Sequence, residues 1–226
     1  MRLPNSRQRT LVIGRTGSGK TVAAVWHLSN ANFLSQPWIV FNHKQDDLVN
    51  SIPGAQFVGL DELPKKPGIY IYSPMPDKDD EAVDELLWRI HARGKTGIYI
   101  DEGYMIPPRS PALNAAYTQG RSKQIPMITL SQRPSRISRF AISESDFFQV
   151  FHLVDERDHD TVKGFISIPR GVKFGEINDA LPKHHSMYYD VAQKKLEILS
   201  PVPDEEIILQ SFEDRFNLSK KKNRLI

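Results

Sequence analysis

One eight-residue stretch near the amino end constrains this chain more than any other. Residues 14–21 read Gly-Arg-Thr-Gly-Ser-Gly-Lys-Thr and match the phosphate-loop pattern G-x-x-x-x-G-K-[ST] at every fixed position. The run before it, 10–13, is a short β-branched strand candidate, and 21–28 reads as a helix. In a strand, glycine-rich turn and helix of this kind, successive backbone N–H groups point inward at a polyphosphate. The sequence therefore predicts a nucleoside triphosphate site.

The residue types in this loop suggest a role for each position. Lys20 is expected to reach the β- and γ-phosphates, and the Thr21 hydroxyl is expected to bind Mg²⁺. The helix that follows adds the partial positive charge of its N-terminus. The cradle around the phosphates is expected to come from Gly14, Arg15, Thr16, Gly17, Ser18 and Gly19.

A second informative stretch is 97–102, Gly-Ile-Tyr-Ile-Asp-Glu, an apolar strand that ends in two acids. Asp101 lies 81 positions after Lys20 and fits the Walker B pattern, in which the carboxylate holds the hydration shell of Mg²⁺. Glu102 is then positioned to orient and deprotonate a water molecule as general base. Acids often end strands, but behind a phosphate loop this pair favours hydrolysis over transfer to a small acceptor.

Two further candidates flank the predicted strand 126–130. Gln132 follows it, at the end of a parallel sheet where an amide side chain can hydrogen-bond the γ-phosphate or the attacking water. Arg121 precedes the strand. It either interacts with the dipole of the helix before it or reaches the phosphates of a neighbouring subunit as an arginine finger.

The sequence leaves two other polar groups open. Residues 42–44, Asn-His-Lys, follow the apolar strand 37–41 and either face the site or form a polar turn before a helix capped by Asp46. Three arginines at three-residue spacing are expected on one face of a helical turn, which is either solvated or contacts DNA phosphates or another subunit. These are Arg133, Arg136 and Arg139.

The wider pattern is an alternation of strands and helices over about the first 150 residues, which predicts a three-layer α/β fold around a mainly parallel sheet. Residues 1–9 are a lead-in to a single domain at 10–216, and their three arginines either contact phosphates or, as is usual for a short terminus, are solvated. A β-hairpin is expected at about 186–199, and 217–226 is a basic tail, either disordered or bound to an anion. Further strands are expected at 55–58, 68–72 and 146–151, and helices at 77–93, 111–119, 156–165 and 205–216.

Composition excludes several classes of protein. The 226 residues include 39% hydrophobic and 25% charged residues, which suits a globular chain with one sizeable core. There is no cysteine, so disulfides and cysteine-bound metals are excluded. No apolar run approaches the roughly 20 residues that span a bilayer, and the amino end lacks the apolar segment of a signal peptide. A net charge of +3 permits contact with a polyanion without establishing it.

The order of these motifs resembles the FtsK–HerA superfamily of DNA-pumping ATPases. The matching stretches are 14–21, 41–44, 98–102, 120–121 and 130–135, and Ser-Gln-Arg-Pro-Ser at 131–135 is especially similar to the sensor motif of that family. The short chain looks like the packaging ATPases of tectivirus-like viruses, which have an internal membrane and double-jelly-roll capsid proteins. Relatives often carry an acid at the end of the second strand, where this chain has Asn42.

The resemblance implies a RecA-like core of the additional-strand, catalytic-glutamate type and an ATP-hydrolysing motor that packages double-stranded DNA into a preformed capsid. Lys20 and Thr21 would bind ATP and Mg²⁺, Asp101 would support the metal through water, and Glu102 would be the base. Gln132 would be the sensor, and Arg121 the finger offered to the next subunit. The implied partners are double-stranded DNA, further copies in a homo-oligomeric ring, expected to be a hexamer, and capsid vertex or portal proteins. The implied location is the virion and the host cytoplasm.

Three alternatives stay open from the sequence. A DNA-transfer or filamentous-phage assembly ATPase would usually carry a membrane helix. A nucleotide or polynucleotide kinase would need neither a glutamine sensor nor an arginine from a neighbour. A nucleotide-binding component of a virion that does not hydrolyse would have no use for the pair Asp101–Glu102.

Overall fold

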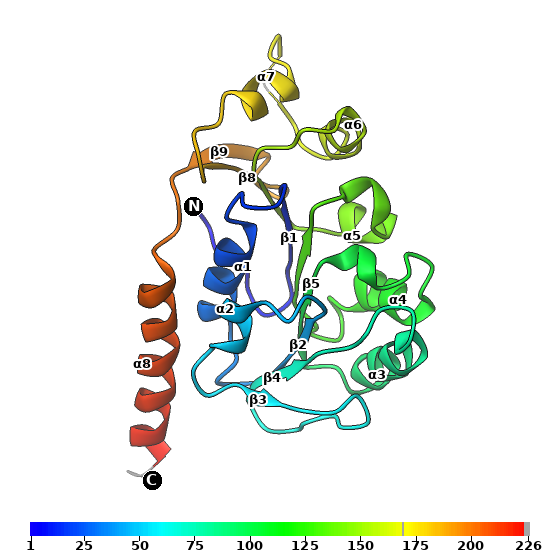
Figure 1. Ribbon diagram of the computed structural model, residues 1–226, viewed down its shortest axis with the longest axis vertical. Coiled ribbons are helices and arrows are strands. Elements are labelled where there is room, and N and C mark those ends of the chain that lie inside the picture. The colour runs from blue at the N-terminus through cyan, green and yellow to red at the C-terminus, as the bar shows by residue number, and fades with distance from the viewer. Residues whose placement is uncertain (169, 224–226) are drawn as a thin grey trace.

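A computed structural model describes residues 1–168 and 170–223 of the chain, arranged as alternating strands and helices (Figure 1). The strands are β1 (Arg9–Ile13), β2 (Pro37–Asn42), β3 (Gln56–Phe57), β4 (Gly68–Tyr72), β5 (Gly97–Asp101), β6 (Met127–Ser131), β7 (Phe147–Val150), β8 (Ser186–Asp190) and β9 (Lys195–Leu199). The helices are α1 (Lys20–Ser29), α2 (Asp47–Asn50), α3 (Asp80–Arg93), α4 (Pro111–Gln119), α5 (Arg139–Ser143), α6 (Glu156–Lys163), α7 (Phe174–Asp179) and α8 (Glu205–Asn223), with short 3-10 turns η1 (Gly103–Met105) and η2 (Pro134–Arg136).

The strands of the described residues form one sheet in the order β3-β4-β2-β5-β6-β1-β7-β8-β9. Strands from β3 to β7 pair in parallel, whereas β8 and β9 add an antiparallel hairpin at one edge. The predicted mainly parallel α/β fold with a C-terminal hairpin is confirmed. The order also puts β6, which ends next to Gln132, between the strand before the phosphate loop and the strand that carries Asp101. This is the additional strand that the motifs implied.

Two helical layers cover the sheet, one on each face, as Figure 1 shows. Leu11 and Ile13 of β1 pack with the apolar face of α3 and with α4, whereas Val12 packs with α1 and α8 on the opposite face. Because successive side chains of a strand point to opposite faces, a continuous apolar run such as β1 must be buried on both sides. The three layers follow from this pattern.

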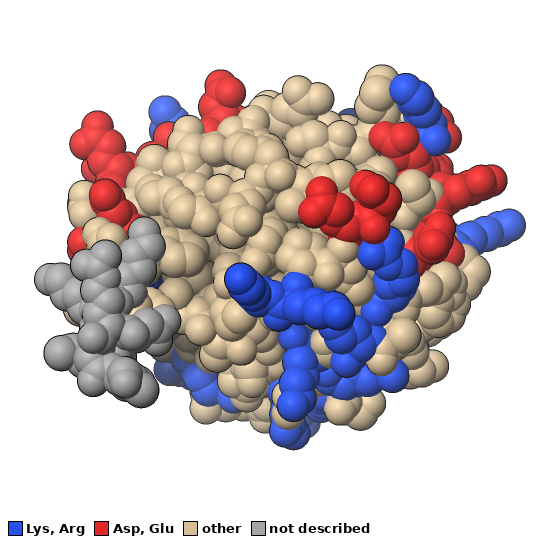
Figure 2. Space-filling model, turned by 90° about the horizontal axis from the view of Figure 1, so that it is seen from below, with Lys and Arg blue, Asp and Glu red and all other residues tan. Residues whose placement is uncertain are grey.

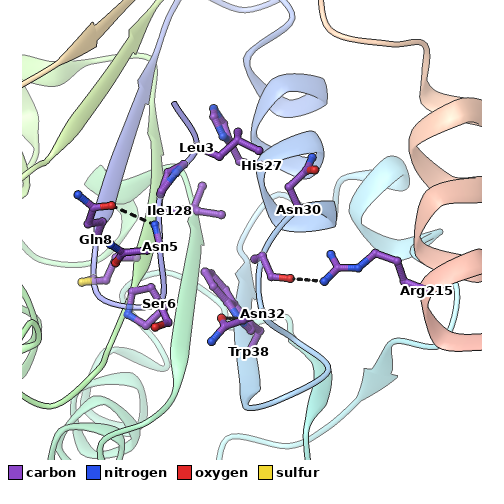
Figure 3. A pocket seen from close by; sticks show the side chains of 14 residues that line it. Leu3, Asn5, Ser6, Gln8, His27, Asn30, Asn32, Trp38, Ile128 and Arg215 are labelled. Carbon is purple, nitrogen blue, oxygen red and sulfur yellow. Dashed lines mark hydrogen bonds between the residues drawn. The ribbon is translucent and has the colours of Figure 1, made fainter. Parts of the chain in front are cut away.

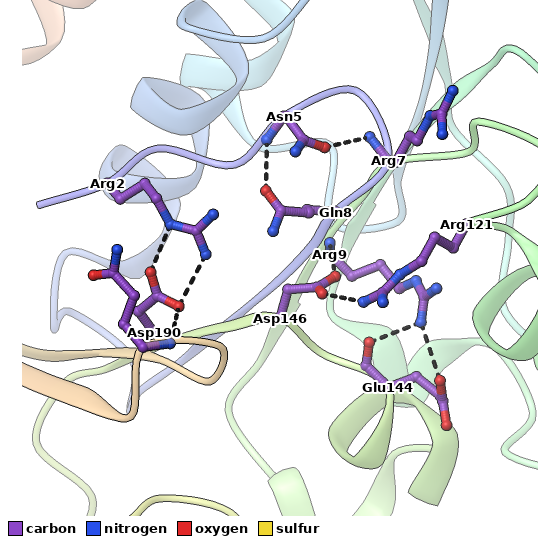
Figure 4. A network of polar contacts seen from close by, with 10 residues as sticks. Arg2, Asn5, Arg7, Gln8, Arg9, Arg121, Glu144, Asp146 and Asp190 are labelled. Carbon is purple, nitrogen blue, oxygen red and sulfur yellow. Dashed lines mark hydrogen bonds and ion pairs between the residues drawn. The ribbon is translucent and has the colours of Figure 1, made fainter.

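The amino-terminal segment differs from the solvated lead-in that the sequence predicted. Arg2 donates two hydrogen bonds to Asp190, at 2.7 and 2.9 Å, and its guanidinium lies over the Phe147 ring. Arg9 is 2% exposed and donates to the carbonyl oxygen of Glu144 at 2.8 Å (Figure 4). Arg2 and Arg7 are exposed and Arg9 is buried, but the segment is not a free lead-in, because it packs beside the hairpin and leads directly into β1.

The last helix is longer than the predicted 205–216. It continues to Asn223, so the basic stretch after Leu218 extends the helix in its described part, and residues 224–226 lie outside the described residues. Phe212 is fully buried against Phe33, and the Arg215 guanidinium lies 4.3 Å from the centre of the Phe33 ring. These contacts fix α8 against the end of α1. Within the described residues, no helix has the length and apolar character needed to cross a membrane.

Candidate active site

The phosphate loop lies between the end of β1 and the start of α1, at the carboxyl ends of the parallel strands. Gly17 and Gly19 have φ values of 74° and 95°, a region that glycine adopts without strain. A Cβ at Gly14 would lie 2.5 Å from Ser18 Oγ and 2.7 Å from Phe151 Cβ, so these side chains leave no room for one there. No side chain caps the start of α1, which leaves its first N–H groups available to an anion. This geometry suits a polyphosphate.

Lys20, Glu102 and Gln132 come together beside this loop, as the motifs predicted. Lys20 is 4% exposed, and its Nζ lies 3.2 Å from Glu102 Oε1. Gln132 donates to Glu102 twice, from Nε2 to Oε1 at 2.7 Å and from its backbone N to Oε2 at 3.0 Å. The Gln132 Oε1 accepts a hydrogen bond of 2.7 Å from Thr16 Oγ1. Gln132 therefore connects the expected base to the phosphate loop.

Glu102 is fully buried, and its backbone has a left-handed φ of 59°. Burial by itself raises the pKa of this carboxyl, but the ammonium groups of Lys20 and Lys44 and the Gln132 hydrogen bond outweigh burial. The net result is a pKa below the ordinary value. Glu102 is thus held as a carboxylate at neutral pH, which is the protonation state a general base needs.

Asp101 is also fully buried, but neither of its carboxylate oxygens has a hydrogen-bond partner among the described residues. Burial raises its pKa to about 6, opposed mainly by the charge of Lys44. An unpartnered buried carboxylate is costly, and a divalent cation offsets that cost. The residues present therefore fit a Mg²⁺ ion held by Asp101, directly or through water, and by the Thr21 hydroxyl.

The described residues contain no group of three or more histidines and acids that could hold a metal by themselves. Mg²⁺ commonly binds one or two protein oxygens and completes its shell with water and substrate phosphates. The site fits that mode, in which metal and triphosphate bind together.

The structure separates the three residues at 42–44 that the sequence left open. Lys44 forms an ion pair with Glu102 and faces the site. Asn42 instead hydrogen-bonds Asn50 Oδ1 at 2.9 Å and the backbone N of Asp46 at 3.0 Å. His43 Nδ1 lies 3.1 Å from the Asp101 carbonyl oxygen, and burial lowers the pKa of its imidazole. The cap alternative is also correct, because Asp46 Oδ1 accepts from the first N–H groups of α2.

Arg121 lies apart from this cluster. It sits in the turn before β6, whereas Gln132 follows the other end of the same strand. Its side chain is 61% exposed and forms an ion pair with Asp146 (Figure 4). Within one chain Arg121 lies at the amino ends of the strands, whereas the phosphate loop lies at their carboxyl ends. Its role as a finger therefore remains a prediction about a neighbouring subunit.

The three arginines expected on one helical face do not share one. Ile137 and Ser138 interrupt the helix between η2 and α5, and the Ser138 side chain caps α5. Arg133 pairs with Asp155 at 3.1 Å, and the Arg139 guanidinium lies 5.8 Å from the centre of the Phe165 ring. The prediction was wrong because three-residue spacing describes one face only within a continuous helix.

Sequence reasoning missed one residue beside the loop, His184. Its Nδ1 lies 3.2 Å from the carbonyl oxygen of Ser18, across 166 positions of the chain. The residue stands in a polar turn with a left-handed φ of 61°, a pattern that carries no signal of a nucleotide site. Only the folded chain brings it to the loop.

Another cavity lies at the amino ends of the strands, beneath the lead-in (Figure 3). Its volume is about 210 Å³, and Leu3, Trp38 and Ile128 line it together with polar side chains. One of those, His27, is buried with its pKa lowered by desolvation to about 4. This cavity is separated from the phosphate loop by the length of the strands and is not part of the site.

Comparison with known proteins identifies the family. No protein-family model matches the chain. The DNA packaging ATPase P9 of Enterobacteria phage PRD1 is 55% identical over 229 residues, which cover 100% of this chain and 99% of the phage protein. The genome packaging NTPase B204 of Sulfolobus turreted icosahedral virus 2 has a similar fold, with a TM-score of 0.67 and 19% identity over 89% of this chain and 100% of B204.

A further similar structure, VirB4 of Thermoanaerobacter pseudethanolicus, has a TM-score of 0.61 and 8% identity over 90% of this chain and 92% of VirB4. Likeness at such low identity concerns the fold alone. The likeness to P9 extends over essentially the full length of both proteins and includes the whole region of the phosphate loop and its partners. The chain therefore belongs to the family of viral DNA packaging ATPases that includes P9 of phage PRD1.

Proposed function

We propose that this protein is an ATP-hydrolysing motor that moves double-stranded DNA into a preformed viral capsid. One observation carries the enzymatic half of the proposal: Lys20 and Gln132 converge on the buried carboxylate Glu102 beside a phosphate loop. The relative P9, named a DNA packaging ATPase, supports the DNA half. Structures of B204 described as complexes with ATP-gammaS and AMPPCP support ATP as the nucleotide.

Binding of ATP would rearrange the contacts around Glu102. The N–H groups of Thr16, Gly17 and Gly19 and of the first turn of α1 hold the phosphates, since those of Gly14 and Arg15 donate to the Ser131 and His152 carbonyl oxygens. The Lys20 ammonium moves from Glu102 to the β- and γ-phosphates. Bound Mg²⁺ supplies charge neutralisation of the phosphate oxygens. Thr21 and Asp101 are the residues that would hold it.

Release of Lys20 leaves Glu102 with the Lys44 and Gln132 donors but one positive charge fewer, which makes the carboxylate a better acceptor for a proton from water. The Gln132 amide, which contacts both Glu102 and the loop residue Thr16, then orients that water and registers whether a γ-phosphate is present. Loss of the γ-phosphate restores the resting contacts. This cycle gives the chain two states that differ in the contacts at the carboxyl ends of the strands.

The surface at the amino ends of the strands carries basic side chains, which supports a partner that carries phosphates. In Figure 1, α6 and α7 follow the carboxyl end of β7 at the top, so the amino ends of the strands face downward. Figure 2, which views the molecule from below, shows Lys and Arg gathered on that side. The turns and segments before β1, β4, β5 and β6 contribute Arg7, Lys65, Lys66, Lys95, Arg121 and Lys123.

Two of these turns are joined directly, since the backbone N of Lys95 donates to the Lys123 carbonyl oxygen at 2.8 Å. In a head-to-tail ring, the basic surface at the amino ends of the strands of one subunit would face the phosphate loop of the next. Arg121 would then leave Asp146 for the triphosphate of the neighbour. We infer a homo-oligomeric ring, a hexamer, that works at the capsid vertex with portal or vertex proteins, in the virion and in the host cytoplasm during assembly.

Particle mass and the fate of the γ-phosphate test this proposal together. The purified chain is expected to release inorganic phosphate from ATP and to form rings with duplex DNA, by mass photometry. Transfer of the phosphate to a nucleoside monophosphate or a polynucleotide end would favour a kinase instead. A monomer whose hydrolysis ignores DNA would contradict the motor.

A further inference from the structure

Among the described residues, three hollows border the phosphate loop, and different residues line each of them. One of about 520 Å³, beside Thr16, Gln132 and Arg133, lies on the side of the catalytic cluster. One of about 320 Å³ is lined by Phe151, Leu181 and Pro182 together with charged and imidazole groups, among them Asp179 and Lys183. The third, of about 260 Å³, opens beside Gly19 and has mainly apolar walls.

The walls of this third hollow come from three distant parts of the chain. Val22 belongs to the first turn of α1, Phe151 follows β7, and the segment 201–205 passes from β9 to α8 on the α1 side of the sheet (Figure 1). Phe151 is 3% exposed, and both Val22 and Val202 pack against the apolar cluster under α1. The rim is polar, with the side chains of Asp204 and Glu205 at the start of α8.

The direction of the triphosphate follows from the site. Glu102 and Gln132 fix the γ-phosphate end, because hydrolysis takes place there. The phosphate chain then runs along the N–H groups at the start of α1, so the nucleoside leaves on the far side of the loop, past Gly19 and Val22. The cavity beneath the lead-in is out of reach, since a five-residue strand such as β1 separates it by about 16 Å.

We propose that this hollow, between Val22, Phe151 and Val202 with Asp204 at its rim, receives the base of ATP. The assignment rests on the proposed function, because it takes the triphosphate to be bound as described above. A flat base would lie between the apolar side chains, as bound cofactors and ligands generally do in largely apolar pockets with few polar groups. His184, held at Ser18 and shared with the neighbouring hollow, borders the entrance from the phosphates.

The rim also gives a chemical reason for choosing adenine over guanine. A carboxylate accepts hydrogen bonds, and the N6 amino group of adenine donates them. Guanine presents the O6 acceptor at the corresponding position, which a carboxylate repels. Asp204 is exposed at the rim, where a base edge that emerges from the apolar walls would meet it.

The test compares ligands with and without a base. ADP, GDP and inorganic pyrophosphate are titrated with Mg²⁺ into the full chain by calorimetry, so that no turnover occurs. Val202→Trp fills the hollow and is expected to weaken ADP binding at least tenfold, while the affinity for pyrophosphate stays within twofold of the parent value. Val191→Trp, in the turn of the hairpin, is the matched control and should change neither affinity.

A second variant, Asp204→Asn, replaces an acceptor by a group that also donates, so the preference for ADP over GDP should fall severalfold. Unchanged ADP affinity in Val202→Trp, or an equal loss for ADP and pyrophosphate, would overturn the base site. An unchanged ADP-to-GDP ratio in Asp204→Asn would overturn the role of the carboxylate. A parent chain that binds neither ADP nor pyrophosphate would instead contradict the proposed function.

Discussion

Asp101 allows a quantitative prediction, because its carboxylate is fully buried without a hydrogen-bond partner among the described residues. Its pKa is raised from 3.8 to about 6. Since the folded-state pKa lies above the unfolded one, folding favours the protonated form. The stabilising effect is complete below about pH 4 and is lost as the pH rises through about 6. A shift of about two pKa units corresponds to about 3 kcal/mol.

Asp101→Asn removes this ionisation with little change of shape. Without metal, at pH 7.5 in EDTA, the variant should be more stable than the parent by about 3 kcal/mol in its free energy of unfolding, measured by urea denaturation. At pH 4 the two proteins should unfold at nearly the same urea concentration. With Mg²⁺ and ADP the order should reverse, because only the parent gains the metal contact.

The contrast between these conditions separates the two roles of the carboxylate. Glu102→Gln is the matched control, because its pKa is lowered and its ionised form already has partners. That variant should lose stability in EDTA at pH 7.5. If Asp101→Asn were equally stable or less stable than the parent in EDTA at pH 7.5, the reasoning about an unpartnered buried charge would be refuted.

Three other side chains, Lys20, Arg121 and His27, can be tested in the same way. Lys20→Ala should weaken ADP binding at least tenfold by calorimetry, whereas Lys163→Ala on α6 should bind normally; equal affinities would remove Lys20 from the site. Inactive Arg121→Ala subunits mixed with inactive Glu102→Gln subunits should regain part of the ATPase rate, and no recovery at any ratio would count against a finger in trans. The pKa of His27 is lowered to about 4, so folding favours its neutral form and the stabilising effect is complete above pH 6.5. About 3 kcal/mol of the free energy of unfolding is lost as the pH falls to 4. His27→Gln should flatten that acid limb in urea titrations, and an unchanged slope would contradict the assignment.

The sequence was most informative where one local pattern decides the structure. A mostly apolar run as short as 97–101 indicates a buried strand rather than a buried helix, and parallel strands bring their carboxyl ends to the same end of the sheet. That is why Lys20, Glu102 and Gln132 could be predicted to meet. The predicted and observed boundaries differ by one to three residues in most elements. For the four-residue α2, the sequence left open whether a helix capped by Asp46 forms.

What the sequence missed depends on contacts between distant parts of the chain. Arg2 is ordered by Asp190, 188 positions away, and a terminal arginine gives no local sign of that partner. His184 reaches Ser18 only because the segment after β7 folds back over the phosphate loop. Lys44 could face the site or solvent from its sequence, and only the position of β2 beside β5 decides that it meets Glu102.

In the proposed function, Glu102 activates water in a motor that acts on DNA. The most direct measurement is the steady-state rate of phosphate release, with and without long duplex DNA, for the parent chain and for Glu102→Gln. DNA is expected to raise the parent rate severalfold, and the variant is expected to bind ATP yet lose at least 100-fold in rate with DNA present. A variant that hydrolyses ATP as fast as the parent, or a parent rate that does not change when DNA is added, would contradict the proposed function.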